Sequence, residues 1–353
     1  MKFNDTFIDF LRYSLSDTNV LPSGIDNIDW KVYLEFCAQQ GIIGVIFRGI
    51  ERSEPKMQQA TLFEWIGQSE SIKAQNMLTN KRMLTVNDYF RKRGYRSCIL
   101  KGQANGLMYP QPEMRSPGDI DIWVEGEREG IIKLVLSETP DAHYSIHHVK
   151  MPVFKDVSVE VHYRPMYLTN WFTDKKLQRY IESIQERQFS NCKSLESGEI
   201  GVLTDEFNAL YQILHMHAHF FSTRNNLKQL IDYYYLLRSR ELRDTVKAEI
   251  AGRLKDFGVL KYAKGIMWIM KEVLGLEERL LIVEKDEKIG RLIFGEVLKY
   301  GTYTNDSPKA LTRQFWANMK LAKVFPQDVL INPFFLVWHQ WWKLRMTLAL
   351  KRD

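Results

Sequence analysis

The chain has 353 residues, of which 45% are hydrophobic and 26% are charged. This length predicts roughly two domains with a full hydrophobic core, and the composition excludes a chain that is disordered throughout. The net charge of +6 favours anionic partners such as phosphates, but the basic residues are spread along the chain and do not separate a nucleotide from a nucleic acid.

The first 93 residues have a helical pattern. Asp29 precedes a run with apolar residues three and four positions apart, which predicts an N-capped helix beginning at Trp30. A longer amphipathic pattern predicts a helix over residues 58–92 that ends at Gly94. We therefore expect an N-terminal helical segment over residues 1–93.

Residues 94–165 change to short, alternating elements. Period-two patterns and neighbouring turn residues predict strands over 95–100, 119–124, 143–149 and 157–162. Helices are predicted between them, over 102–108 and 127–137. The prolines and the glycine of residues 109–118 predict a loop before the second strand. These elements form a small α/β core with a mixed sheet.

Helical patterns return after Pro165 and continue almost to the C-terminus. They predict helices over 203–221, 225–238, 241–257 and 260–274. The expected fold class is therefore α+β, with a small mixed sheet between N-terminal helices and a C-terminal helical bundle. The expected domains are residues 1–93, 94–165 and 166–353.

Two carboxylates stand out in the sheet segment. Asp119 and Asp121 are two residues apart on a predicted strand, so both side chains leave the same face. Carboxylates this close repel each other unless a cation lies between them, and oxygen ligands suit Mg²⁺. The alternative is that Asp119 turns the loop after Gly118 while Asp121 faces water.

A third carboxylate lies on a later strand. The alternation of residues 157–162 puts Glu160 and His162 on one face. If this strand neighbours the aspartates, the three acids allow two metal ions, one for a triphosphate and one for the attacking oxygen. His162 then orients Glu160 or contacts substrate, or it is an ordinary half-buried strand histidine.

Three further residues suit a phosphate. Lys101 and Gly102 end a predicted strand just before a helix, where backbone N–H groups favour anions. Arg115 lies in the loop immediately before the aspartates and can reach a phosphate. The alternative for Lys101 and Arg115 is a solvated side chain.

Taken in order, these motifs resemble a bacterial family of uncharacterised nucleotidyltransferases in the polymerase-beta-like superfamily. The motifs are Leu100-Lys101-Gly102, Arg115 with Gly118-Asp119-Ile120-Asp121, and Glu160-Val161-His162-Tyr163-Arg164. The resemblance continues into His215, His219 and Leu230-Ile231-Asp232. It implies a mixed-sheet nucleotidyltransferase core, magnesium bound by Asp119 and Asp121, and Glu160 as the third carboxylate.

The expected function is that of a Mg²⁺- or Mn²⁺-dependent nucleotidyltransferase. It would move a nucleoside monophosphate group from a nucleoside triphosphate such as ATP to an unknown hydroxyl or phosphate acceptor, releasing pyrophosphate. The expected nucleotide contacts are Lys101, Gly102, Arg115 and His162. Shortly before the paired acids the superfamily usually has Gly-Ser or Gly-Gly, where this chain has Lys101-Gly102-Gln103, and its third acid is commonly aspartate, where this chain has Glu160. The alternative is therefore a nucleotide-binding regulatory or antitoxin-like protein without turnover.

Two features of the later helices are open to more than one interpretation. His215 and His219 are four residues apart and share a helix face, as zinc ligands would, but no glutamate completes a metalloprotease motif. A packed or phosphate-facing role is the other interpretation. Asp232 is either a base for an acceptor hydroxyl or a buried partner of a histidine or arginine.

The expected location is the cytoplasm. The N-terminus lacks a secretory signal pattern, and the three cysteines are few and far apart, as in proteins of a reducing compartment. No stretch is apolar enough for a transmembrane helix. The aromatic stretch over residues 333–346, followed by Lys351-Arg352, is interpreted as core, with peripheral membrane contact as the alternative.

Overall fold

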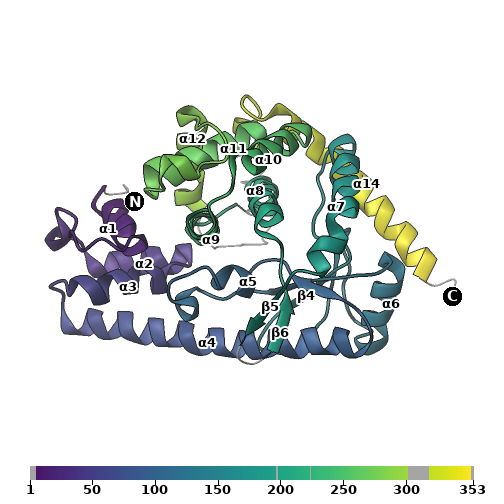
Figure 1. Ribbon diagram of the computed structural model, residues 1–353, viewed down its shortest axis with the longest axis horizontal. Coiled ribbons are helices and arrows are strands. Elements are labelled where there is room, and N and C mark those ends of the chain that lie inside the picture. Colours follow the sequence, from purple (N-terminus) through teal and green to yellow (C-terminus); the bar gives the residue numbers. More distant parts are fainter. Residues whose placement is uncertain (1–4, 196–197, 223, 301–317, 351–353) are drawn as a thin grey trace. The chain divides into compact units, whose positions relative to one another are not determined.

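The computed structural model describes residues 5–195, 198–222, 224–300 and 318–350. The fold is α+β, with many helices and two small sheets (Figure 1), which confirms the predicted class. Two compact units are present. The first combines Met1–Leu78, Asn105–Pro117 and Ala209–Thr304, and the second combines Thr79–Ala104, Gly118–Asn208 and Asn305–Asp353. The division into three consecutive domains stays a prediction.

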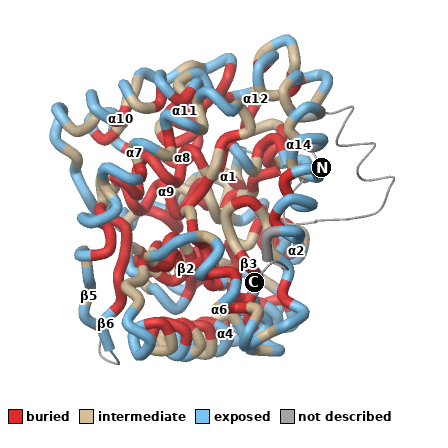
Figure 2. Tube along the Cα trace, turned by 90° about the vertical axis from the view of Figure 1, so that its right-hand side faces the viewer, coloured by how far each residue is buried: buried red, intermediate tan, exposed pale blue. Residues whose placement is uncertain are grey.

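The first unit is helical. Its helices are α1 (Asp5–Leu15), α2 (Trp30–Gln40), α3 (Ile43–Ser53), most of α8 (Asp205–Phe221), α9 (Leu227–Ser239), α10 (Asp244–Asp256), α11 (Leu260–Trp268) and α12 (Glu287–Tyr300). The Asp29 carboxylate accepts the N–H groups of Lys31 and Val32, as the predicted cap requires. Asn226 and Gln229 form a capping box at the start of α9. Helices α8 and α9 are largely buried (Figure 2).

The long helix α4 (Gln59–Lys92) contributes to both units. It begins one residue later than predicted and ends where the sequence indicates. Gly94 follows it with φ +82°, a left-handed conformation that glycine adopts without a steric penalty. Its last turns bury Met83, Val86 and Phe90. The sequence therefore predicts this helix and its end correctly.

A four-stranded sheet lies in the second unit. Its strands are β1 (Ser97–Ile99), β2 (Ile120–Val124), β4 (Val159–His162) and β3 (His148–Lys150), in that spatial order. β2 and β4 are parallel, while β1 and β3 are antiparallel to their neighbours. The sheet is mixed, as predicted, but each strand is shorter than its sequence pattern. All five residues of β2 are buried.

Other elements of the second unit are α5 (Gln103–Gly106) at its boundary, α6 (Arg128–Glu138), α7 (Trp171–Phe189) and α14 (Pro326–Leu350). The prediction of helices alone after Pro165 is wrong for β5 (Cys192–Leu195) and β6 (Gly198–Gly201), which form an antiparallel pair. A Cβ atom at Gly201 would lie 2.1 Å from the carbonyl oxygen of Ser97, so this close approach to β1 requires glycine.

Helix α14 carries the aromatic stretch near the C-terminus. Trp342 and Met346 are buried, whereas Phe334 and Trp341 are 79% and 52% exposed. The core interpretation is therefore correct for one side of the helix and wrong for the other. Lys351-Arg352 lies outside the described residues. Wherever the structure describes the chain, no helix has both the length and the apolar character needed to cross a bilayer.

Candidate active site in the second unit

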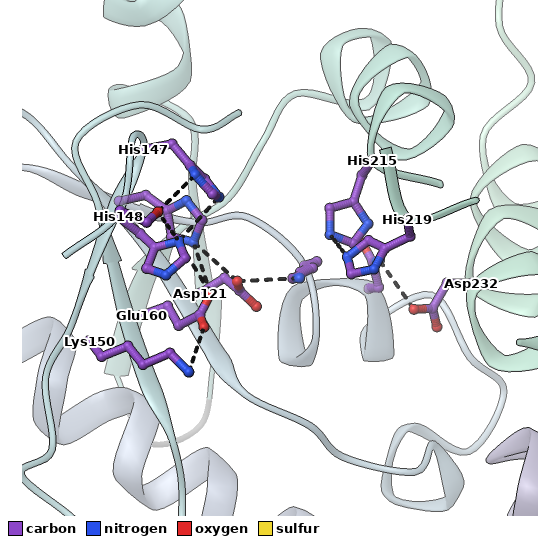
Figure 3. Close-up of polar contacts among 12 residues, drawn as sticks. Asp121, His147, His148, Lys150, Glu160, His215, His219 and Asp232 are labelled. Atoms are coloured by element: carbon purple, nitrogen blue, oxygen red, sulfur yellow. Dashed lines mark hydrogen bonds and ion pairs between the residues drawn. The ribbon is translucent and has the colours of Figure 1, made fainter. Parts of the chain in front are cut away.

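The strand register brings two acidic residues side by side. Asp121 of β2 pairs with Glu160 of the parallel strand β4, so both side chains leave the same face. Lys150 of β3 pairs with Glu160 from the other side. Figure 3 shows the three side chains grouped at this face. Residues distant in sequence thus meet because β4 lies next to β2.

The two carboxylate oxygen atoms of Asp121 differ in their surroundings. Its Oδ1 lies 3.1 Å from His162 Nε2 and 3.3 Å from Lys101 Nζ. Its Oδ2 is buried and has no hydrogen-bond partner among the described residues. Burial alone would raise the pKa of Asp121, but Lys101 and His162 outweigh it and lower the pKa to about 2. Among the residues that the structure describes, the group is therefore an ionised, buried carboxylate with one oxygen that lacks a hydrogen-bond partner.

His162 lies between two oxygen atoms that accept hydrogen bonds. Its Nδ1 faces the carbonyl oxygen of Arg164 at 3.3 Å, and a carbonyl only accepts hydrogen bonds. A neutral imidazole with its proton on Nδ1 would turn the lone pair of Nε2 toward the Asp121 oxygen, whereas an imidazolium donates to both oxygens. Two acceptors this close need a proton or a cation between them.

Asp121, Glu160 and His162 fit a cation. One ligand atom from each residue lies within 4.8 Å of those of the other two. The unsatisfied Oδ2 of Asp121 supplies the structural reason, because a buried carboxylate oxygen without a partner is costly. Carboxylate oxygens are ligands of Mg²⁺ and Mn²⁺. The donor set therefore accommodates the divalent ion expected from the sequence.

Glu160 is mostly buried and has several polar neighbours. Its Oε2 lies 3.6 Å from His148 Nδ1 and 3.9 Å from His162 Nε2, and its Oε1 lies 3.9 Å from Lys150 Nζ. Burial and then the negative charge of Asp121 raise the pKa of Glu160. A cation near both carboxylates would offset this repulsion.

Asp119 differs from Asp121 in its surroundings. It is exposed, lies just before β2, and does not belong to the three-residue ligand cluster found among the described residues. Its negative charge contributes to the raised pKa of Glu160. The two aspartates predicted as an equivalent pair are thus one buried and one exposed group, and Asp119 as a metal ligand stays a prediction.

The loop after β1 lies beside these acids. Lys101 contacts Asp121, with 28% of its side chain exposed. Gly102 adopts φ +63°, and an added Cβ atom would lie 3.3 Å from the carbonyl oxygen of Asp119. Glycine at this position therefore lets the loop approach the start of β2 closely. The predicted nucleotide contacts of Lys101, Gly102 and His162 stay predictions.

His147 and His148, which belong to none of the motifs described above, also lie here. His147 Nε2 is 3.1 Å from His148 Nδ1, and Ser145 Oγ is 3.2 Å from His147 Nδ1. Burial, and then the charge of His162, lower the pKa of His148 to about 3, so its imidazole is neutral near pH 7. Two adjacent histidines in a predicted strand could have indicated a functional site from the sequence. Their position beside Glu160, however, follows only from the strand order.

Arg115 belongs to the helical first unit and has a partner there. Its Nε and Nη2 atoms lie 2.7 and 2.8 Å from the two carboxylate oxygens of Asp232, and both residues are buried. Tyr109 Oη donates to the same carboxylate at 2.6 Å. This geometry gives Asp232 the structural role left open by the sequence. The Arg115 guanidinium is directed at Asp232, so its predicted phosphate contact stays a prediction.

Replacing Asp232 by Asn is expected to destabilise the protein by about 3–5 kcal/mol, because a buried guanidinium would lose its counter-charge. Urea unfolding at pH 7 measures this change. The control is Glu70→Gln, which removes a carboxylate from an exposed pair with Lys73 and is expected to cost no more than about 1 kcal/mol. An equal loss of unfolding free energy in the two variants would contradict the structural role of Asp232.

The buried pair of Arg115 and Asp232 also makes the stability of the protein depend on pH. Burial alone would raise the pKa of Asp232, but Arg115 and Tyr109 outweigh it and lower the pKa. A depressed carboxyl pKa stabilises the fold above the unfolded pKa of about 3.9, and this stabilisation is lost as pH falls through the folded pKa. The stability difference between wild type and Asp232→Asn should therefore shrink on acidification.

The histidines of α8 pack within the first unit. His215 and His219 place their Nε2 atoms 3.1 Å apart (Figure 3), while His217 packs against the rings of Phe221 and Tyr262. In the part of the chain that is described, His215 and His219 do not belong to a group of three potential metal ligands. The packed role is thus observed for the buried His217, while a packed or phosphate-facing role for His215 and His219 stays a prediction.

Comparison with known proteins gives one family match. The model of a family described as uncharacterised nucleotidyltransferase matches residues 26–275, which include every residue of the candidate site. No curated protein matches the chain. A solved structure of an antigenic nucleotidyltransferase-like protein from Paracoccidioides brasiliensis is similar, with 11% identity and a TM-score of 0.35. That similarity covers 63% of this chain and 97% of the other chain.

Proposed function

Because the chain belongs to the family of uncharacterised nucleotidyltransferases, we propose that it transfers a nucleoside monophosphate group from a nucleoside triphosphate, such as ATP, to an acceptor. An oxygen atom of a hydroxyl or phosphate acceptor forms a bond to the α-phosphorus. The bond between the α-phosphorus and its bridging oxygen to the β-phosphorus breaks, and pyrophosphate leaves. An acceptor hydroxyl also loses its proton.

The observation that carries the proposal is the buried Oδ2 of Asp121 next to Glu160, which has no hydrogen-bond partner in the described part of the chain. We assign Asp121, Glu160 and the exposed Asp119 to the binding of Mg²⁺ or Mn²⁺. When bound, such an ion neutralises phosphate charge and activates an oxygen nucleophile. The rigid backbone pairing of β2 and β4 holds two of these carboxylates in place before substrate binds.

The remaining residues have supporting roles in this proposal. Lys101 places a positive charge 3.3 Å from Asp121, where it offsets negative charge on a bound triphosphate. Gly102 lets the backbone of the same loop approach the site. His162 orients the Asp121 carboxylate through its 3.1 Å contact, with its own ring held by the carbonyl of Arg164.

The test is a screen of nucleoside triphosphates against hydroxyl and phosphate acceptors with Mg²⁺ or Mn²⁺, measured by pyrophosphate release. The expected result is release that depends on both an acceptor and the ion. The matched control is the double variant Asp119→Asn with Asp121→Asn. Triphosphate binding without release for any acceptor would instead indicate a nucleotide-binding regulatory protein.

Neutralising Lys101 is expected to weaken triphosphate binding by roughly tenfold or more, because one charge-assisted contact contributes about 1.5–3 kcal/mol. Lys101→Met keeps most of the side-chain length and removes the charge. Affinities of the variant for a nucleoside triphosphate and for the corresponding nucleoside, both measured by calorimetry, separate phosphate from base recognition. Lys155→Met, which removes the charge of an exposed lysine between β3 and β4, is the control. An equal loss for nucleoside and triphosphate would show that Lys101 does not contact phosphate.

A further inference from the structure

We propose that His147, His148 and His162 form a second metal site, which binds a divalent transition-metal ion such as Zn²⁺ or Co²⁺. One ring nitrogen from each of the three histidines lies within 4.8 Å of those of the other two. The site shares His162 with the donor set of Asp121, Glu160 and His162, but its other two ligands are histidine nitrogens instead of carboxylate oxygens. Its existence does not depend on the proposed nucleotidyl transfer.

The backbone places these rings together. His148 of β3 pairs with His162 of β4, so the two side chains leave the same face of the sheet. His147 precedes β3, and its carbonyl oxygen accepts hydrogen bonds from the N–H groups of Tyr163 and Arg164 at 3.1 and 3.2 Å. The three imidazoles are thus held by strand pairing and its continuation.

One nitrogen–nitrogen distance already matches that of a metal site, and the His162 ring nitrogen lies within 4.8 Å of the other two. Ligands on a tetrahedral zinc ion lie about 3.3 Å apart, given Zn–N distances of about 2.0–2.1 Å. His147 Nε2 and His148 Nδ1 are 3.1 Å apart (Figure 3). Glu160 Oε2 lies 3.6 Å from His148 Nδ1 and 3.9 Å from His162 Nε2. Small side-chain movements therefore suffice to bring these atoms around one ion, with Glu160 available as a further ligand.

Hydrogen bonds alone do not satisfy this arrangement. His148 Nδ1 faces three polar atoms, which are His147 Nε2 at 3.1 Å, Ser145 Oγ at 3.4 Å and Glu160 Oε2 at 3.6 Å. One ring nitrogen offers either one N–H or one lone pair, so it forms only one good hydrogen bond. A cation among these atoms would interact with the His148 nitrogen, the His147 nitrogen and the Glu160 oxygen together.

The hydrogen bonds of the Nδ1 atoms of His147 and His162 also support a metal site. His147 Nδ1 lies 3.2 Å from Ser145 Oγ, and His162 Nδ1 lies 3.3 Å from the carbonyl oxygen of Arg164. A metal-bound histidine typically has its second nitrogen held in this way, which fixes the ring and its tautomer. Imidazole ligands suit Zn²⁺, Co²⁺ and Ni²⁺, whereas Mg²⁺ prefers oxygen. The histidine site should therefore not be a magnesium site.

Cobalt binding tests the proposal without nucleotide. The protein carries Cys192→Ser, so that this exposed thiol does not bind the ion. We expect one equivalent of Co²⁺ to give the strong visible absorption of four-coordinate cobalt with nitrogen ligands, and excess Mg²⁺ not to displace it. His147→Ala and His148→Ala should each weaken Co²⁺ binding by about 100-fold or more, since losing only an outer hydrogen-bond partner costs about 10–100-fold.

The matched control is His143→Ala, which removes an exposed histidine from the same segment. It should leave the affinity and the spectrum unchanged. Thermal unfolding verifies that each variant is folded, and His147→Gln replaces any alanine variant that is not. Absence of stoichiometric binding, an equal loss in His143→Ala, or displacement by equimolar Mg²⁺ would overturn the proposal. Because nucleotide is absent, either result leaves the test of nucleotidyl transfer unaffected.

Discussion

Changing Asp119 and Asp121 together to Asn should abolish the Mg²⁺ or Mn²⁺ dependence of triphosphate binding. Each lost charge-assisted contact is worth about 1.5–3 kcal/mol, so losing two lowers the affinity roughly 10²–10⁴-fold. Asp121 should account for most of this loss of affinity. Its buried Oδ2 has no hydrogen-bond partner within the described residues, and its neighbours favour the ionised form. Calorimetry with and without the ion gives both affinities.

The control for this double variant removes two negative charges elsewhere in the second unit. Asp141→Asn with Glu129→Gln changes two exposed acids and should leave metal-dependent binding intact. Thermal unfolding must show that both double variants are folded. The single variants then divide the effect between the buried Asp121 and the exposed Asp119. Triphosphate binding that is independent of the ion, and unchanged in the aspartate variant, would refute the assignment.

Glu160→Gln should lower turnover by roughly 10²–10³-fold while leaving triphosphate affinity within a few-fold of wild type. Glu160 lies beside Asp121 through the pairing of β2 and β4 and is therefore positioned as the third carboxylate. An acid that acts chiefly on the attacking oxygen stabilises the transition state more than the bound substrate. The acceptor found by pyrophosphate release is needed for this measurement, which compares kcat with the triphosphate Kd.

The variant Glu160→Asp separates the effect of the charge from that of the side-chain length. It keeps the charge but shortens the side chain by one methylene group. Turnover of this variant should lie between those of wild type and Glu160→Gln. Near-native turnover in Glu160→Gln would show that the third acid lies elsewhere. A parallel loss of triphosphate affinity would instead place Glu160 in ground-state binding.

Local signals in the sequence predict much of the fold. The cap at Asp29, the end of α4 at Gly94 and the alternation in β2 each depend on residues close together in the chain. Such signals act over one or two turns of helix or a few strand residues, so they need no knowledge of distant partners. The β5–β6 pair was missed because its strands have only four residues each and little apolar alternation.

The candidate site could be predicted only in part. The acidic residues could be recognised as candidates from the sequence. The position of Glu160 beside Asp121, however, depends on the pairing of β4 with β2. The different burial of Asp119 and Asp121 depends on the surrounding fold. Arg115 and Asp232 are 117 residues apart, and no local pattern connects them. Pairings of this kind arise from tertiary structure, which a single sequence does not reveal.

The interleaved chain path has a consequence for dissecting the protein. Within the described residues, the backbone passes from one unit to the other between residues 78 and 79, 104 and 105, 117 and 118, and 208 and 209. A fragment of residues 94–165 would lack Phe90, which is fully buried and packs against Tyr95, as well as the strand bearing Gly201. Truncation should therefore yield insoluble pieces, and separable units would require circular permutation or rejoining of the segments.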